Sequence, residues 1–256
     1  MEKCNHGSGS GALYVVGTGP GSVKNMTLAA SEVLAKVDVI IGYKTYLELI
    51  PEFLEGKEVL SSEMMKEVDR CRKALESAAE GKQVALVSGG DPGIYAMAGL
   101  VFEMAKEADY SCTIEIIPGL AAINSCAARL GAPLMHDFAA VSLSDLLTPW
   151  ELIEKRLEAV AVADFVTAIY NPRSKRRTKQ IIRAREIFLS HRDPKTPVGI
   201  VTAATRENEK IVITTLEEML EQEIGMQSTV IIGNSQTYTW NDLMITPRGY
   251  GDKYQL

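Results

Sequence analysis

The chain has 256 residues, of which 46% are hydrophobic, and its 27 basic and 33 acidic side chains leave a formal net charge of −6. This composition excludes a disordered, collagen-like or coiled-coil chain, because so apolar a chain with so small a net charge builds cores. The length fits one large α/β unit or two half-size domains, since domains usually have roughly 100 to 200 residues. A mildly acidic chain gives no electrostatic reason for bulk nucleic-acid binding, so we expect a small-molecule partner.

The four cysteines, at positions 4, 71, 112 and 126, are widely spaced and form no CxxC pair. Such spacing is typical of buried thiols in a reducing compartment. Residues 1–11 are polar and glycine-rich, without the apolar core of a signal peptide, and no later stretch approaches the ~20 apolar residues of a membrane span. We therefore expect a cytoplasmic protein with no membrane partner and a flexible segment over residues 1–11.

The first half alternates short runs rich in valine and isoleucine with longer segments of helical period. Strands are predicted at 13–16, 37–41, 84–87 and 114–117, and helices at 26–36, 64–80 and 94–108. Gly81 is predicted to end the second of these helices, since glycine is common just after a helix. This βαβ-like alternation predicts a largely parallel sheet.

A change of pattern follows Pro118-Gly119, where a helix over 121–130 is predicted to stop at Gly131 and Pro133. Strands are then predicted near 139–143, 165–170, 198–202, 210–214 and 229–232, with helices at 149–161 and 174–191. The short link over 206–209 favours an antiparallel hairpin, and thus a mixed sheet. We predict an N-terminal α/β domain over 12–118, a C-terminal α/β domain over 119–247 and a tail over 248–256.

A glycine-rich loop, GTGPGS, occupies residues 17–22 directly after the first predicted strand. Missing side chains let a ligand approach the backbone closely, although a tight turn without a ligand is the alternative. The loop is no dinucleotide fingerprint, because position 22 is Ser and no acidic residue ends the second strand. It is no P-loop either, because the required Gly-Lys-Ser/Thr is missing and Pro20 removes a backbone donor.

A second such loop, SGGDPGIY, occupies residues 88–95 after the strand at 84–87. The carboxyl ends of parallel strands meet at one edge of a sheet, where open α/β sheets bind ligands, so both loops are expected there. Asp91 has two interpretations that the sequence leaves open. It accepts hydrogen bonds from a ligand amine or ribose, or it caps the helix that begins after Pro92.

Three motifs in order resemble the tetrapyrrole methylase superfamily, which methylates porphyrin and corrin precursors: GTGPGS, SGGDPGIY and PGLAAINSCAARLGAPL at 118–134. The resemblance spans residues 12–247. Within the superfamily, GYKTY at 42–46, VSLSDLLTPW at 141–150 and YNPRSKRR at 170–177 resemble the precorrin-3B C17-methyltransferases of cobalamin biosynthesis, which contract the macrocycle.

This resemblance implies two α/β domains with an interdomain cleft for S-adenosylmethionine, which leaves as S-adenosylhomocysteine, and it implies a homodimer. Carried over position by position, the cofactor contacts implied are Pro20, Gly89, Gly90, Asp91, Ile94, Ala121, Ala122, Asn171 and Ala204. Some relatives have Thr where this chain has Ala121 and an apolar residue where it has Asn171, and backbone contacts there do not depend on the side chain.

Methyl transfer from a sulfonium needs mainly in-line placement of a carbon nucleophile and exclusion of water. No metal is required for that step, and the chain has only three histidines and no clustered metal ligands. The His136-Asp137 pair is interpreted as a loop hydrogen bond rather than a metal site. Cys4 and His6 are too few to indicate a metal site.

The implied substrate carries many carboxylates and calls for cations. Seven of the thirteen residues from 173 to 185 are basic in a chain that is acidic overall. A solvated helix face is the alternative, but cations at the start of the helix predicted over 174–191 oppose its dipole by ~0.3 to 1 kcal/mol each, and a polyanionic ligand would compensate. We expect Arg173, Lys175 and Arg176 to bind substrate carboxylates.

Ring contraction, which the resemblance implies, moves protons and so needs acid or base help. Ser142, Ser144 and Asp145 follow a predicted strand in a polar loop and are the candidate catalytic residues. Asp145 or Thr148 has the alternative role of capping the next helix, with Pro149 in its first turn. Tyr43, after the second strand, is expected to line the substrate site or to belong to the core.

Three other functions remain compatible with these residues. One is a sibling methyltransferase acting at another macrocycle carbon, and another is a related-fold methyltransferase acting on protein or RNA, which the basic run would serve. The third is a module that binds the nucleotide without consuming it. Salt-sensitive binding would mark a nucleic-acid substrate, and a coloured ligand retained through purification would mark a corrinoid.

Overall fold

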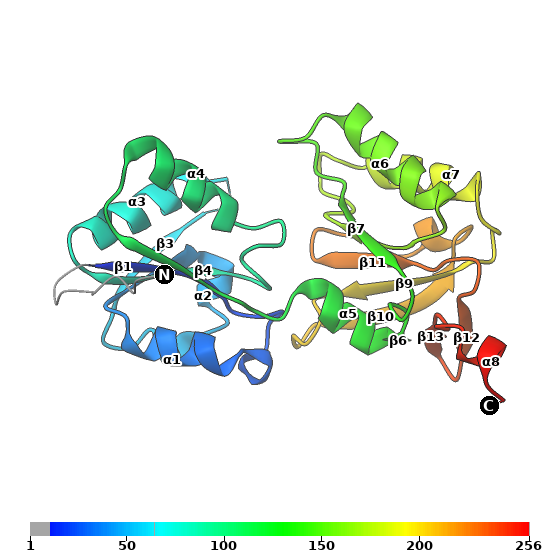
Figure 1. The fold of residues 1–256 in the computed structure, drawn as a ribbon, viewed down its shortest axis with the longest axis horizontal. Helices are drawn as coiled ribbons and strands as arrows, with labels where there is room; N and C mark the ends of the chain where they lie inside the picture. The colour runs from blue at the N-terminus through cyan, green and yellow to red at the C-terminus, as the bar shows by residue number, and fades with distance from the viewer. Residues whose placement is uncertain (1–10, 64, 256) are drawn as a thin grey trace. The chain divides into compact units, whose positions relative to one another are not determined.

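The structure is a computed structural model that describes residues 11–63 and 65–255 (Figure 1). The chain divides into two compact units, one ending at Ala122 and the other beginning at Ile123. The flexible segment expected at the start of the chain lies outside the described residues except for Gly11. Cys4 and His6 lie outside them as well.

The first unit is built on a five-stranded sheet in which every neighbouring pair is parallel. Its strands are β1 (Ala12–Gly17), β2 (Val39–Tyr43), β3 (Glu58–Ser62), β4 (Gln83–Ser88) and β5 (Thr113–Ile117), in the spatial order β3-β2-β4-β1-β5. The predicted α/β class with a largely parallel first sheet is confirmed. Strand β3 was not predicted.

Helices cover both faces of this sheet: α1 (Leu28–Lys36), α2 (Lys44–Leu47), α3 (Glu67–Ala79) and α4 (Ala98–Ala108), with short 3-10 turns at Val23–Asn25 and Pro51–Phe53. Leu13 and Val15 of β1 pack with buried side chains of α3 and α4, whereas Val16 packs with those of α1. Figure 1 shows α1 on the face opposite α3 and α4. The helices that follow the adjacent strands β1 and β4 therefore lie on opposite faces of the sheet. The carboxyl ends of these two strands form a topological switch point, the position where such sheets bind ligands.

Two predicted helices begin later than expected, after residues with left-handed backbone. The helix expected from residue 64 begins at Glu67, beyond Met65 with φ of 65°, and the helix expected from residue 94 begins at Ala98, beyond Tyr95 with φ of 52°. Left-handed residues cannot continue a right-handed helix. Gly81 ends α3 as predicted, with φ of 95° and its N–H bonded to the carbonyl of Ala78 at 3.0 Å.

The second unit contains the predicted mixed sheet, in the order β10-β9-β11-β8-β7. Its strands are β7 (Phe138–Ser142), β8 (Val166–Tyr170), β9 (Pro197–Thr202), β10 (Lys210–Thr215) and β11 (Ser228–Ile232). β7 pairs with β8 in parallel, and β11 is antiparallel to both β8 and β9. β7, β8 and β9 consequently run in one direction, and their carboxyl ends share one edge.

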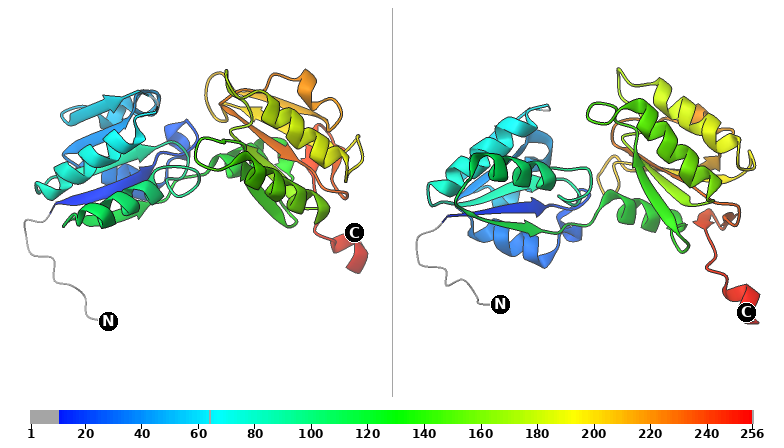
Figure 2. Two further views of the ribbon diagram at one scale, coloured as in Figure 1. Left: turned by 90° about the horizontal axis from the view of Figure 1, so that it is seen from above. Right: turned by 45° about the horizontal axis from the view of Figure 1, so that its top comes forward.

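The helices of this unit include α5 (Ala122–Leu130), whose first residue is the last of the first unit, α6 (Trp150–Val162), α7 (Lys179–Leu189) and α8 (Tyr250–Lys253), with a 3-10 turn at Met219–Glu221. Buried side chains of α6 and α7, such as Leu157 and Phe188, form one core with the sheet residues Ile169 and Val230. Figure 2 shows α6 and α7 side by side on one face of the sheet. A small sheet of β12 (Tyr238–Trp240), β13 (Leu243–Ile245) and β6 (Gly131–Ala132) was not predicted.

The prediction of a helix over 174–191 is wrong at its start, because α7 begins at Lys179. Ser174 and Arg177 instead close a turn, with the Ser174 N–H bonded to the Arg177 carbonyl at 2.9 Å and the Arg177 N–H bonded to Ser174 Oγ at 3.0 Å. The local side-chain hydrogen bond of the serine competes with helix formation. The basic residues before Lys179 thus lie in a loop, so the dipole of α7 does not oppose their charges as the sequence predicted.

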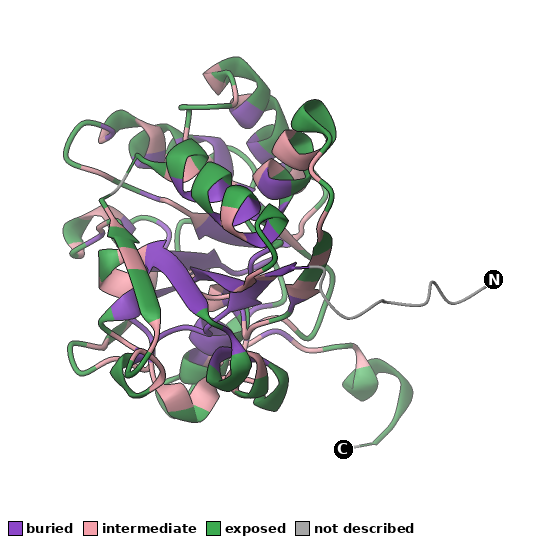
Figure 3. Cartoon of the chain, turned by 90° about the vertical axis from the view of Figure 1, so that its left-hand side faces the viewer, coloured by how far each residue is buried: buried purple, intermediate pink, exposed green. Residues whose placement is uncertain are grey.

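Burial follows the alternation that the sequence predicts. In Figure 3 the central strands are largely purple, and the helices carry buried and exposed residues in turn. The edge strands β3 and β10 are exposed or half-buried along their length. None of the helices in residues 11–63 and 65–255 has the length and apolarity needed to cross a membrane.

Candidate functional site

The two glycine-rich loops of the first unit are bonded to each other. Gly19 donates its N–H to the Gly90 carbonyl at 3.1 Å, and Gly90 donates its N–H to the Gly19 carbonyl at 2.7 Å. Thr18 N–H bonds to the Ser88 carbonyl at 2.9 Å, which continues the pairing of β1 with β4. The prediction that both loops meet at the carboxyl edge of the sheet is confirmed.

A third segment, the one after β5, packs into these loops through Gly119. A Cβ atom added at Gly119 would lie 2.1 Å from the Gly90 carbonyl oxygen and 2.8 Å from Gly17 Cα, and one added at Gly17 would lie 2.6 Å from Gly119 N. Backbone approaches this close require glycine on both sides. The ends of β1, β4 and β5 therefore form one tightly packed edge.

Asp91 binds these segments together from the middle of the second loop. Its Oδ1 accepts the Gly93 N–H at 2.8 Å, and its Oδ2 accepts the Gly119 N–H at 3.1 Å. The interpretation of Asp91 as a helix cap is wrong, because α4 begins at Ala98 with Met97 as its N-cap residue. A carboxylate oxygen accepts more than one hydrogen bond, so Asp91 keeps acceptor capacity beyond these two.

Large apolar side chains lie exposed on the same loop, since Ile94 is 40% and Tyr95 54% exposed. Of the other predicted cofactor residues, Pro20 and Ala121 are buried, while Gly89 and Ala122 are half-buried. Six of the seven predicted cofactor residues of this unit thus lie in the three packed segments that follow β1, β4 and β5. The seventh, Ala122, is the first residue of α5.

Tyr43, predicted for the substrate site or the core, is half-buried at the end of β2. Its ring meets that of Tyr46 edge to face, with centroids 5.4 Å apart. The Tyr46 ring in turn covers Gly89, where an added Cβ would lie 2.6 Å from Tyr46 Cε1. Tyr43 therefore reaches the second glycine loop through Tyr46.

In the second unit, the ends of β7 and β8 bring together three of the predicted residues. Asn171 Nδ2 donates to Ser142 Oγ at 3.0 Å, and the Ser144 N–H donates to the same oxygen at 3.2 Å. A hydroxyl has two lone pairs and one proton, so Ser142 accepts two hydrogen bonds and retains its O–H as a donor. Asn171 has φ of 49°, a left-handed conformation that asparagine tolerates.

Asp145 is exposed in the loop after β7, and its Oδ2 accepts Gln180 Nε2 of α7 at 2.8 Å. The interpretation of Asp145 or Thr148 as the cap of α6 is wrong, because Pro149 is the N-cap residue and no side chain caps this end. The Asp145 carboxylate is therefore engaged with α7.

The basic run divides into exposed and buried members. Arg173, Lys175 and Arg176 are exposed, whereas Arg177 is only 7% exposed. Arg177 Nη2 donates to the Asn171 carbonyl at 2.8 Å and lies 3.7 Å from Met226 Sδ, and within the described part of the chain its buried Nε has no partner. Burial lowers the pKa of Arg177, and the negative charge of Asp145 opposes this shift. Sequence reasoning did not single out Arg177, since a run of identical charges carries no signal of which member is buried.

The end of β9 carries the predicted residue Ala204, which is buried. Its neighbours Ala203 and Thr205 are left-handed, with φ of 52° and 66°. Because β7, β8 and β9 are parallel to one another, this segment lies on the same edge of the sheet as Ser142 and Asn171.

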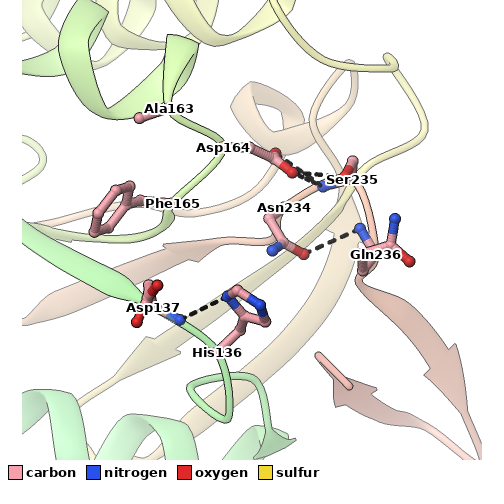
Figure 4. A pocket seen from close by; sticks show the side chains of 8 residues that line it. All are labelled: His136, Asp137, Ala163, Asp164, Phe165, Asn234, Ser235 and Gln236. Carbon is pink, nitrogen blue, oxygen red and sulfur yellow. Dashed lines mark hydrogen bonds between the residues drawn. The ribbon is translucent and has the colours of Figure 1, made fainter. Parts of the chain in front are cut away.

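The opposite edge of this sheet carries a polar pocket of about 290 Å³, lined by His136, Asp137, Ala163, Asp164, Phe165, Asn234, Ser235 and Gln236 (Figure 4). The His136-Asp137 pair that the sequence suggested as a loop hydrogen bond is one, because His136 Nδ1 accepts the Asp137 N–H at 2.8 Å. Asp164 accepts from Ser235 N–H and Oγ, at 3.0 and 2.6 Å. Among residues 11–63 and 65–255, no three His, Cys, Asp or Glu side chains are grouped as a metal site would require.

A comparison with known protein families assigns this chain to one of them. The family model described as "Tetrapyrrole (Corrin/Porphyrin) Methylases" matches residues 12–220, most of the chain. The chain belongs to the tetrapyrrole methylase family. It is therefore a methyltransferase, and the resemblance inferred from the glycine-rich motifs is confirmed.

Curated relatives in the tetrapyrrole methylase family are closely similar. The chain is 54% identical over 250 residues to a "Cobalt-factor III methyltransferase" of Priestia megaterium, covering 96% of this chain and 46% of that one. It is 47% identical to a "Probable cobalt-factor III C(17)-methyltransferase" of Salmonella typhimurium, covering 93% and 99%. It is 42% identical to a "Precorrin-3B C(17)-methyltransferase" of Sinorhizobium sp, covering 96% and 100%. The chain thus spans about half the length of the first of these relatives.

Solved structures agree with the family assignment. The methyltransferase CobJ matches with a TM-score of 0.89 and 38% identity, covering 93% of this chain and 100% of that one. A uroporphyrin-III C-methyl transferase from Thermus thermophilus, complexed with S-adenosyl homocysteine, matches with a TM-score of 0.67 and 26% identity, covering 87% and 92%. The predicted tetrapyrrole methylase fold is confirmed.

Proposed function

We propose that this chain transfers a methyl group from S-adenosylmethionine to C17 of a corrinoid precursor, with contraction of the macrocycle, in cobalamin biosynthesis. One observation carries the proposal. The chain is 47% identical to a probable cobalt-factor III C(17)-methyltransferase over 99% of that protein's length. The match leaves no room in that relative for another domain to supply the activity.

The edge of the first unit is the proposed site for S-adenosylmethionine, held by Pro20, Gly89, Gly90, Asp91, Ile94, Ala121 and Ala122. The residues fit such a ligand. A Cβ added at Gly90 would meet no atom nearer than 3.7 Å, so the missing side chain leaves room beside the paired loops. Asp91 offers a carboxylate acceptor next to the exposed apolar side chain of Ile94, and this position is a switch point of the sheet.

Asn171 and Ala204 of the second unit complete the proposed set of cofactor contacts. Asn171 has positive φ directly after β8, and Ala204 lies between two residues of positive φ after β9. S-adenosylmethionine supplies an electrophilic methyl group on a sulfonium and leaves as S-adenosylhomocysteine. The chain's own contribution to this step is to bind, orient and exclude water.

A corrinoid fits the second unit better than RNA or a protein chain does. The loop after β7 exposes Leu146 by 72% and Leu147 by 98%, and the exposed cations Arg173, Lys175 and Arg176 follow β8. A macrocycle with an apolar face and carboxylates on its rim complements apolar and cationic groups at the same edge of a sheet. A chain with net charge −6 offers little to a phosphate backbone.

Ser142 is the residue best placed to assist the proton transfers of ring contraction. Its oxygen accepts from Asn171 Nδ2 and from the Ser144 N–H, which leaves its O–H to donate to substrate. Ser144 supports it through the main chain. Asp145 remains a candidate base, held by Gln180.

The test is incubation of the purified chain with methyl-labelled S-adenosylmethionine and, separately, cobalt-factor III and precorrin-3B, followed by mass and absorption spectra. We expect one methyl gained with a changed chromophore on the cobalt compound, because the two most identical of the relatives above are named for it. A methyl gained without ring contraction would identify a sibling enzyme. Label found only in added protein or RNA would overturn the corrinoid proposal.

The assembly and setting belong to the same proposal. We expect a homodimer in the cytoplasm, without a nucleic-acid or membrane partner. Light scattering on the eluting protein measures the mass in solution, and a mass of one chain would contradict the dimer.

A further inference from the structure

The segment that follows β9 holds two residues in a backbone conformation that their side chains disfavour. Ala203 has φ of 52° and Thr205 has φ of 66°, and they flank Ala204. Among residues 123–255, the other positions with positive φ are Gly, Asn or Asp. Those types tolerate left-handed backbone, whereas the β-branched Thr205 is strained there.

The surroundings must stabilise this strained conformation, and one carboxylate does so directly. Glu209 Oε2 accepts the Thr205 N–H at 2.5 Å, and the same oxygen accepts Arg129 Nε of α5 at 3.0 Å. The Glu209 side chain is 20% exposed, compared with 46% for Arg129, so the carboxylate lies in the less solvated position. A hydrogen bond to a charged acceptor is about twice as strong as a neutral one.

The rest of the segment is closed by its own backbone. Arg206 N–H bonds to the Ala203 carbonyl at 3.0 Å and Glu209 N–H to the Arg206 carbonyl at 3.1 Å, and the antiparallel pair of Thr202 with Lys210 fixes both ends. The strained residues are thus held in one geometry on the edge that the parallel strands share. Strain that the surroundings hold in place is characteristic of ligand sites, where it pre-organises the backbone.

We propose that Glu209 is a positioning residue for S-adenosylmethionine. Its carboxylate, oriented by Arg129, holds the backbone at 203–205 in the conformation that presents Ala204 to the cofactor. This inference rests on the proposed function. Pre-organisation raises affinity because the ligand no longer orders the loop as it binds.

The test uses the full chain and measures the Kd of S-adenosylmethionine by calorimetry, without any corrinoid. Glu209→Gln keeps the size of the side chain but removes its charge, and we expect binding to weaken about tenfold. Glu207→Gln removes the charge of an exposed residue of the same segment, and its Kd should equal that of the wild type. In the methyl-transfer assay, Glu209→Gln should raise the KM for S-adenosylmethionine and leave kcat nearly unchanged.

A second variant separates positioning from general stability. Thr205→Gly removes the strain that Glu209 holds, because glycine adopts positive φ freely. In the Thr205→Gly background, Glu209→Gln should therefore weaken binding by clearly less than tenfold. This pair also keeps the test decisive if the single Glu209→Gln variant folds poorly, since the double variant should then recover folding and its Kd can be compared with that of Thr205→Gly.

Each result decides a different point. A Kd for Glu209→Gln equal to that of Glu207→Gln, or an equal loss with Thr and with Gly at position 205, overturns the positioning role. A wild-type chain that binds no S-adenosylmethionine overturns the proposed function, and the role of Glu209 with it. A normal wild-type Kd together with an unaltered Glu209→Gln variant leaves the proposed function intact and rejects the inference alone.

Discussion

Arg177 Nη2 donates a 2.8 Å hydrogen bond to the backbone carbonyl of Asn171, the left-handed residue that follows β8. The side-chain amide of the same asparagine donates to Ser142 Oγ. A buried cation therefore holds the turn that carries the amide, and the amide in turn orients the serine hydroxyl. The buried Arg177 thus has a structural role, whereas its exposed neighbours in the basic run are the proposed contacts for substrate carboxylates.

Replacing Arg177 with methionine should destabilise the second unit. The Asn171 carbonyl would lose its partner at a cost of about 1 to 3 kcal/mol, and the relief of burying a charge offsets part of this, so we expect a net loss of about 1 kcal/mol. Urea unfolding measures it. Arg176→Met is the matched control for stability, because that exposed residue should change the unfolding free energy by less than about 0.5 kcal/mol. An unfolding free energy equal in the two variants would contradict the structural role of Arg177.

Gly119→Ala should disrupt the packed edge of the first unit. The new Cβ would lie 2.1 Å from the Gly90 carbonyl oxygen, a backbone atom that cannot move aside without separating the paired loops. We expect a loss of several kcal/mol and no measurable binding of S-adenosylmethionine. Gly99→Ala in α4 is the control, because an added Cβ there meets no atom within 4 Å and alanine favours the helix by up to ~1 kcal/mol. Equal thermal stability and equal affinity in the two variants would disprove this account.

Ser142→Ala should lower kcat for ring contraction more than Ser144→Ala does. The Ser142 hydroxyl is the proposed donor, whereas Ser144 contributes its main-chain N–H, which alanine retains. General acid–base assistance is worth roughly 10²- to 10⁴-fold in rate, so a loss in that range is expected for Ser142→Ala and little change for Ser144→Ala. Single-turnover spectra of the contracting chromophore measure the step. If Ser144→Ala proves the slower variant, the roles are reversed.

The glycine-rich loops could be predicted from sequence because their constraint is local. Close backbone approach demands glycine, and Gly17, Gly90 and Gly119 each meet another segment's backbone or leave space beside it. The contact of Gly19 with Gly90 could be expected as well, because loops that follow parallel strands lie at the same edge of the sheet. The class of fold and the first edge of the site were accessible for this reason.

Features that depend on distant partners could not be predicted. β3 was missed because Glu58, Ser61 and Ser62 are polar and leave only two apolar residues in the strand, too few for the apolar run of a buried strand, and only its pairing with β2 reveals it. The predicted start of α7 was wrong because Ser174 and Arg177 form local hydrogen bonds that close a turn before the helix. The burial of Arg177 and the hydrogen bond of Glu209 to Thr205 depend on tertiary contacts, which the pattern of charges along the sequence does not reveal.

The buried thiols of Cys71 and Cys126 should make stability depend on pH in the alkaline range. Burial raises the pKa of each to about 11, from 9.0 for an unperturbed thiol. Because the folded state disfavours the thiolate, each thiol contributes stability that is fully present below about pH 9 and is lost as pH rises through about 11. The contribution is on the order of 2 kcal/mol for each thiol.

Unfolding free energies of the Cys71→Ala/Cys126→Ala variant and of the wild type, measured from pH 8 to 11, test this prediction. Lysines and tyrosines titrate equally in both proteins, so the difference between the two curves isolates the thiols. We expect the variant to lose less stability than the wild type between pH 9 and 11, whatever constant offset its smaller side chains cause. Cys112→Ala, at a half-buried position, is the control and should follow the wild-type curve more closely. Parallel curves for the double variant and the wild type would show that these thiols ionise as freely in the folded chain as in the unfolded one.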